Sequence, residues 1–277
     1  MVSSRLIRLF FLCTQILLLI IKVNFTQALL GPRGDPISHC SNDKGNYTTG
    51  STYQTNLNGL LFDLHSYNNG YGYFNSSRGE NIDRVYTIGL CRGLIREDVC
   101  SMCPTDAENY IREGCPNQEA IGWQNDCMLR YSNRSIYGMM QTNPDFYLKN
   151  DANVSTGLDA FSQERSHLLN RLAQKTVTGG DLRKFATGNA SIPSTDITIY
   201  GLVECTPELS EQSCIDFLNY TIGVFGSCCS ASIGVRIVTP SCGLRYENFT
   251  FFYDTTETPT ANTAIPGGIT SWHHFSI

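Results

Sequence analysis

Two stretches of the chain carry apolar residues at the spacing of an α-helix. Each stretch places these residues three or four positions apart, so that they fall on one face of a helix. In the stretch 52–65 they are Leu57, Leu60, Leu61 and Leu64, and in the stretch 158–176 they are Phe161, Leu168, Leu169 and Leu172. Both stretches are therefore predicted to be helices that pack one face against a core.

Short runs rich in β-branched and aromatic residues follow each of these helices and predict strands. A second predicted helix covers about 100–113 in the first half of the chain and about 211–225 in the second half. The predicted strands are 85–88 and 128–131 in the first half, and 197–200, 235–238 and 249–253 in the second half. Strands that do not alternate regularly with helices favour an α+β fold, with helices packed on one antiparallel sheet.

The cysteines repeat at a nearly constant offset along the chain. Three cysteines of a first cluster are each followed by a cysteine 114 residues later, and a fourth is followed by one after 115 residues. The pairs are Cys91 with Cys205, Cys100 with Cys214, Cys115 with Cys229, and Cys127 with Cys242. This regularity predicts two copies of one module, at 33–141 and 147–254. The tail at 255–277 is rich in threonine, shows no apolar periodicity, and is predicted to be flexible.

The first 28 residues have the pattern of a secretory signal peptide. Residues 1–8 are positively charged, and the largely apolar run at 9–21 is too short to span a membrane but suits a signal-peptide core. Small residues at Thr26 and Ala28 place the cleavage site after Ala28. No later stretch is long and apolar enough for a transmembrane segment, so we expect a secreted, extracellular protein.

Composition and charge exclude two classes of protein. With 41% hydrophobic and 16% charged residues, the 277-residue chain is too apolar for an intrinsically disordered protein. Its formal net charge is −5, and Arg5, Arg8 and Lys22 belong to the predicted signal peptide, so the mature chain is more acidic still. Such a chain offers no evident basic surface for a phosphate backbone, and no nucleic-acid partner is expected.

Sequons and cysteines agree with a secretory, oxidising destination. We expect glycans on several of the seven Asn-x-Ser/Thr sequons beyond the signal peptide, which lie at Asn46, Asn75, Asn133, Asn153, Asn189, Asn219 and Asn248. All cysteines except Cys13 would enter that compartment, where disulfides are expected rather than a metal site. The Cys100-x-x-Cys103 motif lacks a second ligand pair for zinc, and Phe217 takes the place of Cys103 in the repeat. Neither a metal nor another cofactor is therefore expected.

The cysteine spacing also resembles that of a known plant family. Cys91, Cys100 and Cys103 give the pattern Cys-x8-Cys-x2-Cys, and a degenerate second copy follows. The supporting segments are YTIGLC at 86–91, YGLVEC at 200–205, KFATG at 184–188, the cysteine pair at 228–229 and PSCGLRYE at 240–247. The chain is similar over 33–254 to the plant cysteine-rich repeat secretory proteins. Their repeated unit, the ginkbilobin-homologous domain, also builds the ectodomains of cysteine-rich receptor-like kinases. The resemblance implies two tandem, disulfide-stapled modules, each a five-stranded antiparallel sheet packed against two helices.

The same resemblance implies which cysteines pair, where six cysteines alone would allow 15 connectivities. The implied disulfides are Cys40–Cys115, Cys91–Cys100 and Cys103–Cys127 in the first copy, and Cys205–Cys214 in the second copy. Three cysteines then remain, so either one thiol stays free or the chain is linked to another molecule. We expect Cys242 to pair with Cys228 or Cys229, and the other of these two to be unpaired or to form a disulfide-linked dimer.

The sequence offers little for catalysis, whereas two residues point to carbohydrate binding. It holds no His-Glu-x-x-His and no Gly-x-Ser-x-Gly motif, so an enzyme is not expected. Mannose-binding members of the resembled family use an asparagine after the first cysteine, an arginine before the last one and a glutamate after it. The first copy has Ser41, Ile121 and Ser132 at these positions. The second copy has Arg236 and Glu247, and no clear counterpart of the asparagine. These two residues are candidate sugar ligands, or they form a structural ion pair between neighbouring strands.

The expected function follows from the resemblance rather than from a motif. The resemblance implies a secreted, non-enzymatic binding protein of the plant apoplast, acting in defence or stress signalling. Its partner would be a cell-wall carbohydrate or the ectodomain of a receptor. The alternative is a shortened ectodomain of a cysteine-rich receptor-like kinase that acts by association with membrane receptors.

Overall fold

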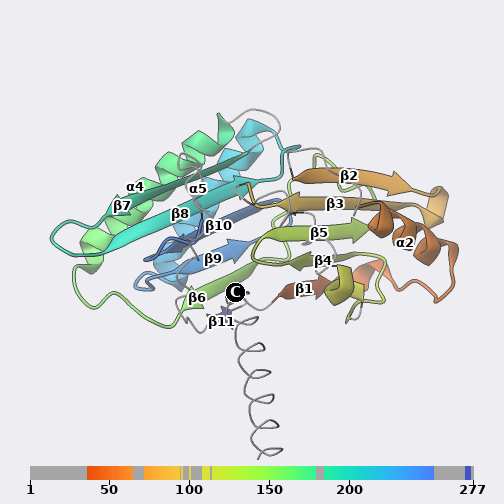
Figure 1. Cartoon of the computed structure of the whole chain (residues 1–277), viewed down its shortest axis with the longest axis horizontal. Coiled ribbons are helices and arrows are strands. Elements are labelled where there is room, and N and C mark those ends of the chain that lie inside the picture. Colours follow the sequence, from red (N-terminus) through yellow and green to blue (C-terminus); the bar gives the residue numbers. More distant parts are fainter. Residues whose placement is uncertain are drawn as a thin grey trace, which may run out of the picture.

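The computed structural model describes residues 36–64, 72–93, 95, 100, 108–112, 114–178, 184–252 and 272–275. These residues form two antiparallel sheets that lie side by side, domain 1 from the first half of the chain and domain 2 from the second half (Figure 1). The predicted signal peptide, 1–28, lies outside the described residues. Within the described part, no helix combines the length and the apolar character that a membrane crossing requires.

Domain 1 is a five-stranded antiparallel sheet with the strand order β1-β4-β5-β3-β2. Its elements are β1 (Ile37–Cys40), the 3-10 helix η1 (Asn42–Lys44), α2 (Thr52–Leu64), β2 (Tyr73–Arg78), the 3-10 helix η2 (Asn81–Asp83), β3 (Val85–Cys91), β4 (Ala120–Trp123) and β5 (Cys127–Ser132). The predicted helix at 52–65 is confirmed as α2, and its four leucines share a buried core with Val85 and Leu129 of the sheet. Of the predicted second helix, residues 100 and 108–112 are helical, and 101–107 and 113 lie outside the described residues.

Domain 2 is a six-stranded antiparallel sheet with the strand order β11-β6-β9-β10-β8-β7. Its elements are β6 (Phe146–Asn150), α4 (Leu158–Val177), β7 (Phe185–Ser191), β8 (Thr198–Cys205), α5 (Glu211–Cys228), β9 (Val235–Val238), β10 (Cys242–Glu247) and β11 (Trp272–Phe275). Both predicted helices are confirmed, and they pack together on one face of the sheet (Figure 1). The start of α5 is set by Ser210, whose side chain accepts a hydrogen bond from the N–H of Ser213.

Two predictions concern the last part of the chain. The predicted strand at 249–253 is wrong, since the described residues 249–252 are not in a strand. β10 ends at Glu247, and its last pair with β9 joins Tyr246 to Val235. The tail predicted to be flexible contributes β11, which pairs antiparallel with β6 and satisfies backbone groups that an edge strand would leave open. The intervening residues 253–271 lie outside the described residues.

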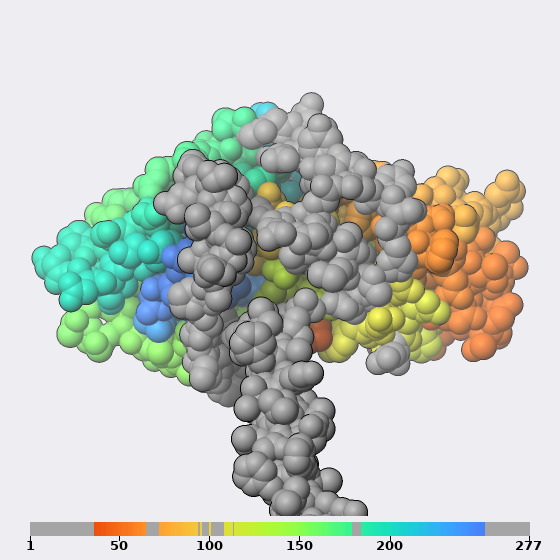
Figure 2. All heavy atoms as spheres, viewed as in Figure 1, coloured from red at the N-terminus to blue at the C-terminus, as the bar shows by residue number. Residues whose placement is uncertain are grey.

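The two domains meet through a shared apolar cluster. Trp123 of β4 donates from its indole N–H to the carbonyl of Thr239, 3.2 Å away, and its ring lies 5.3 Å from that of Phe146 in β6. Val238 of domain 2 is buried in the same cluster as Trp123. The other buried members of this cluster come from domain 1 and the linker, and they are Ile37, Ile88, Ile121, Met128 and Ile136. The domains form the two ends of a molecule that is longer than it is wide, with domain 1 in orange and yellow and domain 2 in green and blue (Figure 2).

Candidate functional site

Three of the disulfides implied by the family resemblance are present. Cys40–Cys115, Cys91–Cys100 and Cys205–Cys214 are bonded, with Cα atoms 5.4, 5.7 and 6.0 Å apart. Cys127 is also disulfide-bonded, and its predicted partner Cys103 lies outside the described residues. The covalent framework of domain 1 is therefore the one that the resemblance implied, as far as it is described.

The prediction for the last three cysteines is wrong. Cys228 and Cys229 bond to each other, and Cys242 is a free, buried thiol. The sulfur of Cys242 lies within 4.8 Å of that of Cys214, near the start of α5, whereas Cys228 ends the same helix. A helix rises about 1.5 Å per residue, so the two ends are roughly 20 Å apart and Cys242 cannot reach the adjacent pair. Neither Cys228 nor Cys229 is unpaired or free to link a second chain.

A row of polar side chains lies on the sheet face of domain 2 that is turned away from α4 and α5. Arg236 of β9 is directly opposite Arg245 of β10, and Glu247 follows two residues later at the end of β10. Asn150 ends β6, and its N–H donates to the carbonyl of Gly234 at 2.8 Å. Residues that lie opposite each other on paired strands, or two apart on one strand, point to the same face of the sheet. The residues on either side of Arg236 and Arg245 point to the other face and belong to the core that the helices cover. The register thus gathers an asparagine, an arginine and a glutamate on one face.

The sheet register identifies the asparagine that the sequence pattern did not. Cys40 pairs with Ala120 in domain 1, and Lys149 pairs with Val235 in domain 2. Ala120 and Val235 lie 115 residues apart, the same offset that separates Cys127 from Cys242. They are therefore equivalent positions in the two copies. Lys149 therefore stands where Cys40 stands, and Asn150 is the residue after it. Sequence reasoning missed Asn150 because a lysine replaces the cysteine that would have marked it.

Glu247 is completely buried, and one of its two oxygens has no hydrogen-bond partner. Its Oε1 accepts from Nε of Arg245 at 2.9 Å, while its Oε2 lies over Gly234 without a partner. Burial raises the pKa of the Glu247 carboxyl to about 7, against the opposite effect of Arg245. Asn150 is similar, because its Oδ1 accepts from the N–H of Ala152 at 3.0 Å and its buried Nδ2 is unpartnered.

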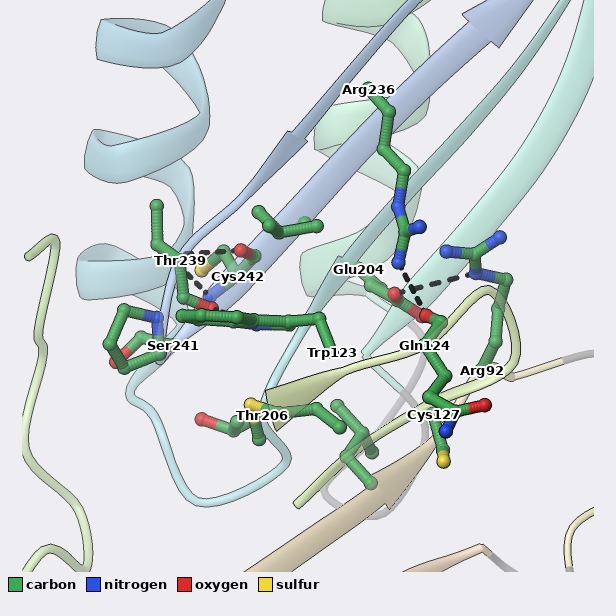
Figure 3. Close-up of a pocket in the computed structure, with 15 residues that line it drawn as sticks. Arg92, Trp123, Gln124, Cys127, Glu204, Thr206, Arg236, Thr239, Ser241 and Cys242 are labelled. Atoms are coloured by element: carbon green, nitrogen blue, oxygen red, sulfur yellow. Dashed lines mark hydrogen bonds and ion pairs between the residues drawn. The ribbon is translucent and has the colours of Figure 1, made fainter. Parts of the chain in front are cut away.

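Arg236 reaches from domain 2 to domain 1 (Figure 3). Its guanidinium donates to the carbonyl of Gln124 and, at 3.1 Å, to Oδ1 of Asn125, both in the turn between β4 and β5. Burial lowers the pKa of Arg236, and the nearby Arg92 lowers it further. The ion pair considered for Arg236 is not formed, because Glu247 is paired instead with Arg245 on its own strand.

A cavity of about 30 Å³ lies between the domains beside Arg236 (Figure 3). Residues of both domains line it, among them Trp123, Glu204 and Cys242, and Nε of Arg92 is 3.7 Å from Oε1 of Glu204. A volume of this size holds roughly one water molecule, which rules out a sugar ring in the cavity itself.

The equivalent face of domain 1 has different chemistry. Ile121, at the position of Arg236, is buried in the apolar cluster between the domains. Ser132, at the position of Glu247, donates to Glu119 at 2.9 Å, and Glu119 also pairs with Arg130 at 2.6 Å. Glu119, Arg130 and Ser132 thus satisfy one another, unlike Asn150, Arg236 and Glu247 in the domain 2 row.

The sequon asparagines differ in their exposure. Six of them are exposed, while Asn133 is half-buried and donates from Nδ2 to Oε1 of Gln118 at 2.7 Å. A glycan on Asn133 would compete with that contact. The other six positions leave room for a glycan on the folded protein.

Changing Gly234 to alanine is expected to destabilise domain 2 by about 1–3 kcal/mol, as other added groups in packed cores do. A Cβ at this position would lie 2.0 Å from Oε2 of Glu247, and that side chain is buried and held by Arg245. Urea denaturation followed by circular dichroism measures the change. The matched control is Gly226→Ala in α5, where a Cβ meets no atom within 4 Å and should stabilise the helix slightly. Equal effects of the two substitutions would contradict the packing of Glu247 over Gly234.

Comparison with known proteins places both domains in one family. The sequence model described as salt stress response/antifungal matches residues 39–134 and 148–249. The chain is 40% identical to cysteine-rich receptor-like protein kinase 29 of Arabidopsis thaliana, over 79% of this chain and 32% of the kinase. It is 35% identical to cysteine-rich repeat secretory protein 38 of the same plant, over 76% of this chain and 83% of that protein. The chain thus spans about a third of the length of the receptor-like kinases that it matches.

A solved structure has the same fold. The tandem DUF26 ectodomain of the Arabidopsis thaliana cysteine-rich receptor-like protein PDLP8 superposes with a TM-score of 0.64 and 19% identity, covering 76% of this chain and 95% of that one. The two antiparallel sheets with their helices and disulfides are those of a tandem ectodomain of this kind. The resemblance inferred from the cysteine spacing and the predicted α+β fold are both confirmed.

Proposed function

We propose a function that starts from one established point, namely that this chain belongs to the salt stress response/antifungal family. The protein is a non-enzymatic binding protein of the plant apoplast that acts in defence or stress signalling. Its secreted relative, its disulfides and its exposed sequons all support an extracellular site of action. The receptor-like kinase relative supports a binding role as well, since its catalytic part is not covered by this chain.

The ligand that we propose is a carbohydrate, bound by the row of Asn150, Arg236 and Glu247 in domain 2. One observation carries this choice: each of the three side chains is buried and keeps one donor or acceptor atom without a partner. An amide, a guanidinium and a carboxyl group at fixed positions suit the hydroxyls of a sugar. Buried polar atoms of this kind are costly to leave unpaired, so a ligand that satisfies them gains affinity.

Access to the row requires a movement of the segment that follows β10. The ring of Phe251 lies 4.4 Å from the guanidinium of Arg245, and the ring of Phe252 packs edge-on against Tyr200. We propose that 248–252 moves away when a sugar binds beside Glu247. Phe251→Ala should then raise the affinity, because it removes a contact that competes with the ligand.

Asn150→Asp and Glu247→Gln are each expected to weaken sugar binding by about tenfold or more, since each alters an unpartnered atom that the ligand would use. Asn150→Asp keeps the oxygen that accepts from Ala152 and replaces only the free donor. A glycan array with mannose-containing and other cell-wall oligosaccharides, followed by calorimetry, measures the effect. Ser41→Ala, at the matched position of domain 1, should leave binding unchanged. No glycan bound by the wild type, or equal affinities of all variants, would contradict the proposal.

A second candidate is association with a receptor ectodomain. Phe62 of α2 and Ile82 of η2 are apolar side chains that remain 75% and 86% exposed, which is unusual for residues of this size. This alternative would be favoured if the protein captures a receptor-like kinase ectodomain and binds no glycan. The capture should then be lost in Phe62→Ser or Ile82→Ser.

A further inference from the structure

Three cysteine sulfurs gather at the end of domain 2 that faces domain 1. The Sγ atoms of Cys205, Cys214 and Cys242 lie within 4.8 Å of one another, and all three residues are buried. Cys205 and Cys214 form a disulfide, and the free Cys242 sulfur is 2.7 Å from that of Cys205. A thiol therefore touches a disulfide to which it is not bonded.

The strand register would also permit the other pairing of Cys205. Cys205 of β8 lies directly opposite Cys242 of β10. In the neighbouring pair the N–H of Thr206 donates to the carbonyl of Ser241 at 2.8 Å, so Cys205 and Cys242 form a non-hydrogen-bonded pair. Such pairs have Cα atoms about 4.5 Å apart. This separation falls within the range of roughly 4.4–6.8 Å seen in disulfides.

We propose that domain 2 has two disulfide isomers, in which Cys205 is bonded either to Cys214 or to Cys242. In the exchange, the deprotonated sulfur of Cys242 attacks Sγ of Cys205 and forms the new S–S bond. The Cys205–Cys214 bond breaks, and Cys214 leaves as a thiolate that takes up the proton lost by Cys242. The numbers of thiols and disulfides do not change, so the step needs no oxidant or reductant.

The position of Cys214 favours its role as the leaving group. It lies in the first turns of α5, where the helix N-terminus stabilises a negative charge. A more stable thiolate leaves faster in thiol–disulfide exchange. Burial raises the pKa of Cys242, so the attacking form is scarce and the exchange is expected to take minutes to hours rather than seconds.

Domain 1 has the same register without the free thiol. Cys91 lies directly opposite Cys127 and is bonded to Cys100, but Cys127 is itself held in a disulfide. Phe217 takes the place of Cys103 in the second copy and leaves Cys242 without that partner. The exchange is therefore specific to domain 2.

The two isomers tie different elements together. The Cys205–Cys214 bond joins β8 to α5, whereas a Cys205–Cys242 bond would join β8 to β10 and release the start of the helix. The loop 206–210 between β8 and α5 contacts domain 1 through a hydrogen bond from Tyr73 to Glu208. Exchange would therefore loosen a segment that helps to dock the two domains.

The decisive variant is Cys214→Ser, examined by non-reducing peptide mapping with thiol labelling under denaturing conditions. We expect a Cys205–Cys242 peptide and no labelled thiol on either residue. Two labelled thiols, on Cys205 and Cys242, would overturn the proposal. The matched control is Cys100→Ser in domain 1, where one labelled thiol should remain because Cys127 is already bonded and Cys91 has lost its partner.

The wild type gives a second, independent reading if Cys214→Ser does not fold. The secreted protein is incubated at pH 8.5 for increasing times, quenched with acid, labelled and mapped. We expect the label to move in part from Cys242 to Cys214 with time. Label on Cys242 alone at every time point would overturn the proposal.

Discussion

Replacing Cys40 and Cys115 together by serine is expected to lower the free energy of unfolding of domain 1 by about 4 kcal/mol. This disulfide joins residues 75 positions apart, and the entropy that a crosslink removes from the unfolded chain grows with the length of the loop it closes. It also holds β1, an edge strand of only four residues, against the rest of the domain. Urea denaturation of the secreted protein measures the loss.

The Cys228–Cys229 disulfide is the matched control for this prediction. It closes a loop between adjacent residues, so its removal by serine should cost about 1 kcal/mol or less by the same entropy argument. Domain 2 should unfold at nearly the same urea concentration with or without it. A cost as large as that of Cys40–Cys115 would mean that loop length does not govern the contribution of these disulfides.

The elements that the sequence predicted well are those whose signal is local. The leucines of 52–65 lie on one helix face within a single segment, and the structure has α2 at Thr52–Leu64. The constant cysteine offset is equally independent of tertiary structure, and it revealed the two domains. By contrast, β1 and β11 are strands of four residues that exist because β4 and β6 offer them backbone partners. Nothing within such short segments distinguishes them from loops.

The site was only half visible for a similar reason. Arg236 and Glu247 could be found because Cys242, between them, marks their positions in the repeat. Asn150 became visible only through the register of β6 with β9, since no cysteine precedes it. The pairing of Cys242 also depended on distances, because linear spacing does not reveal that α5 separates Cys228 from Cys242 by its whole length.

Domain 2 is expected to lose stability as the pH rises from about 4.5 to about 7, because of Glu247. Burial raises the pKa of this carboxyl to about 7 in the folded protein, above its ordinary value of 4.5. Between these two values the folded state holds a proton that the unfolded state has released, so raising the pH favours unfolding. At 1.36 kcal/mol per pKa unit the loss is roughly 3 kcal/mol and is complete above pH 7.

Glu247→Gln should remove this slope, because glutamine keeps the uncharged form at every pH. Urea denaturation of both proteins between pH 4 and 8 should give stability curves that converge at low pH and separate as the pH rises.

Glu119 of domain 1 provides a control of opposite sign. Burial would raise the pKa of Glu119, but hydrogen bonds from Arg130 and Ser132 lower this pKa overall. The ionised Glu119 therefore stabilises domain 1 at pH values above the pKa of the unfolded chain, and this stabilisation is lost as the pH falls. Glu119→Gln should therefore flatten the acid side of the domain 1 profile and leave the neutral side of domain 2 unchanged. Parallel curves for the wild type and Glu247→Gln would instead mean that Glu247 ionises as readily in the folded protein as in the unfolded chain.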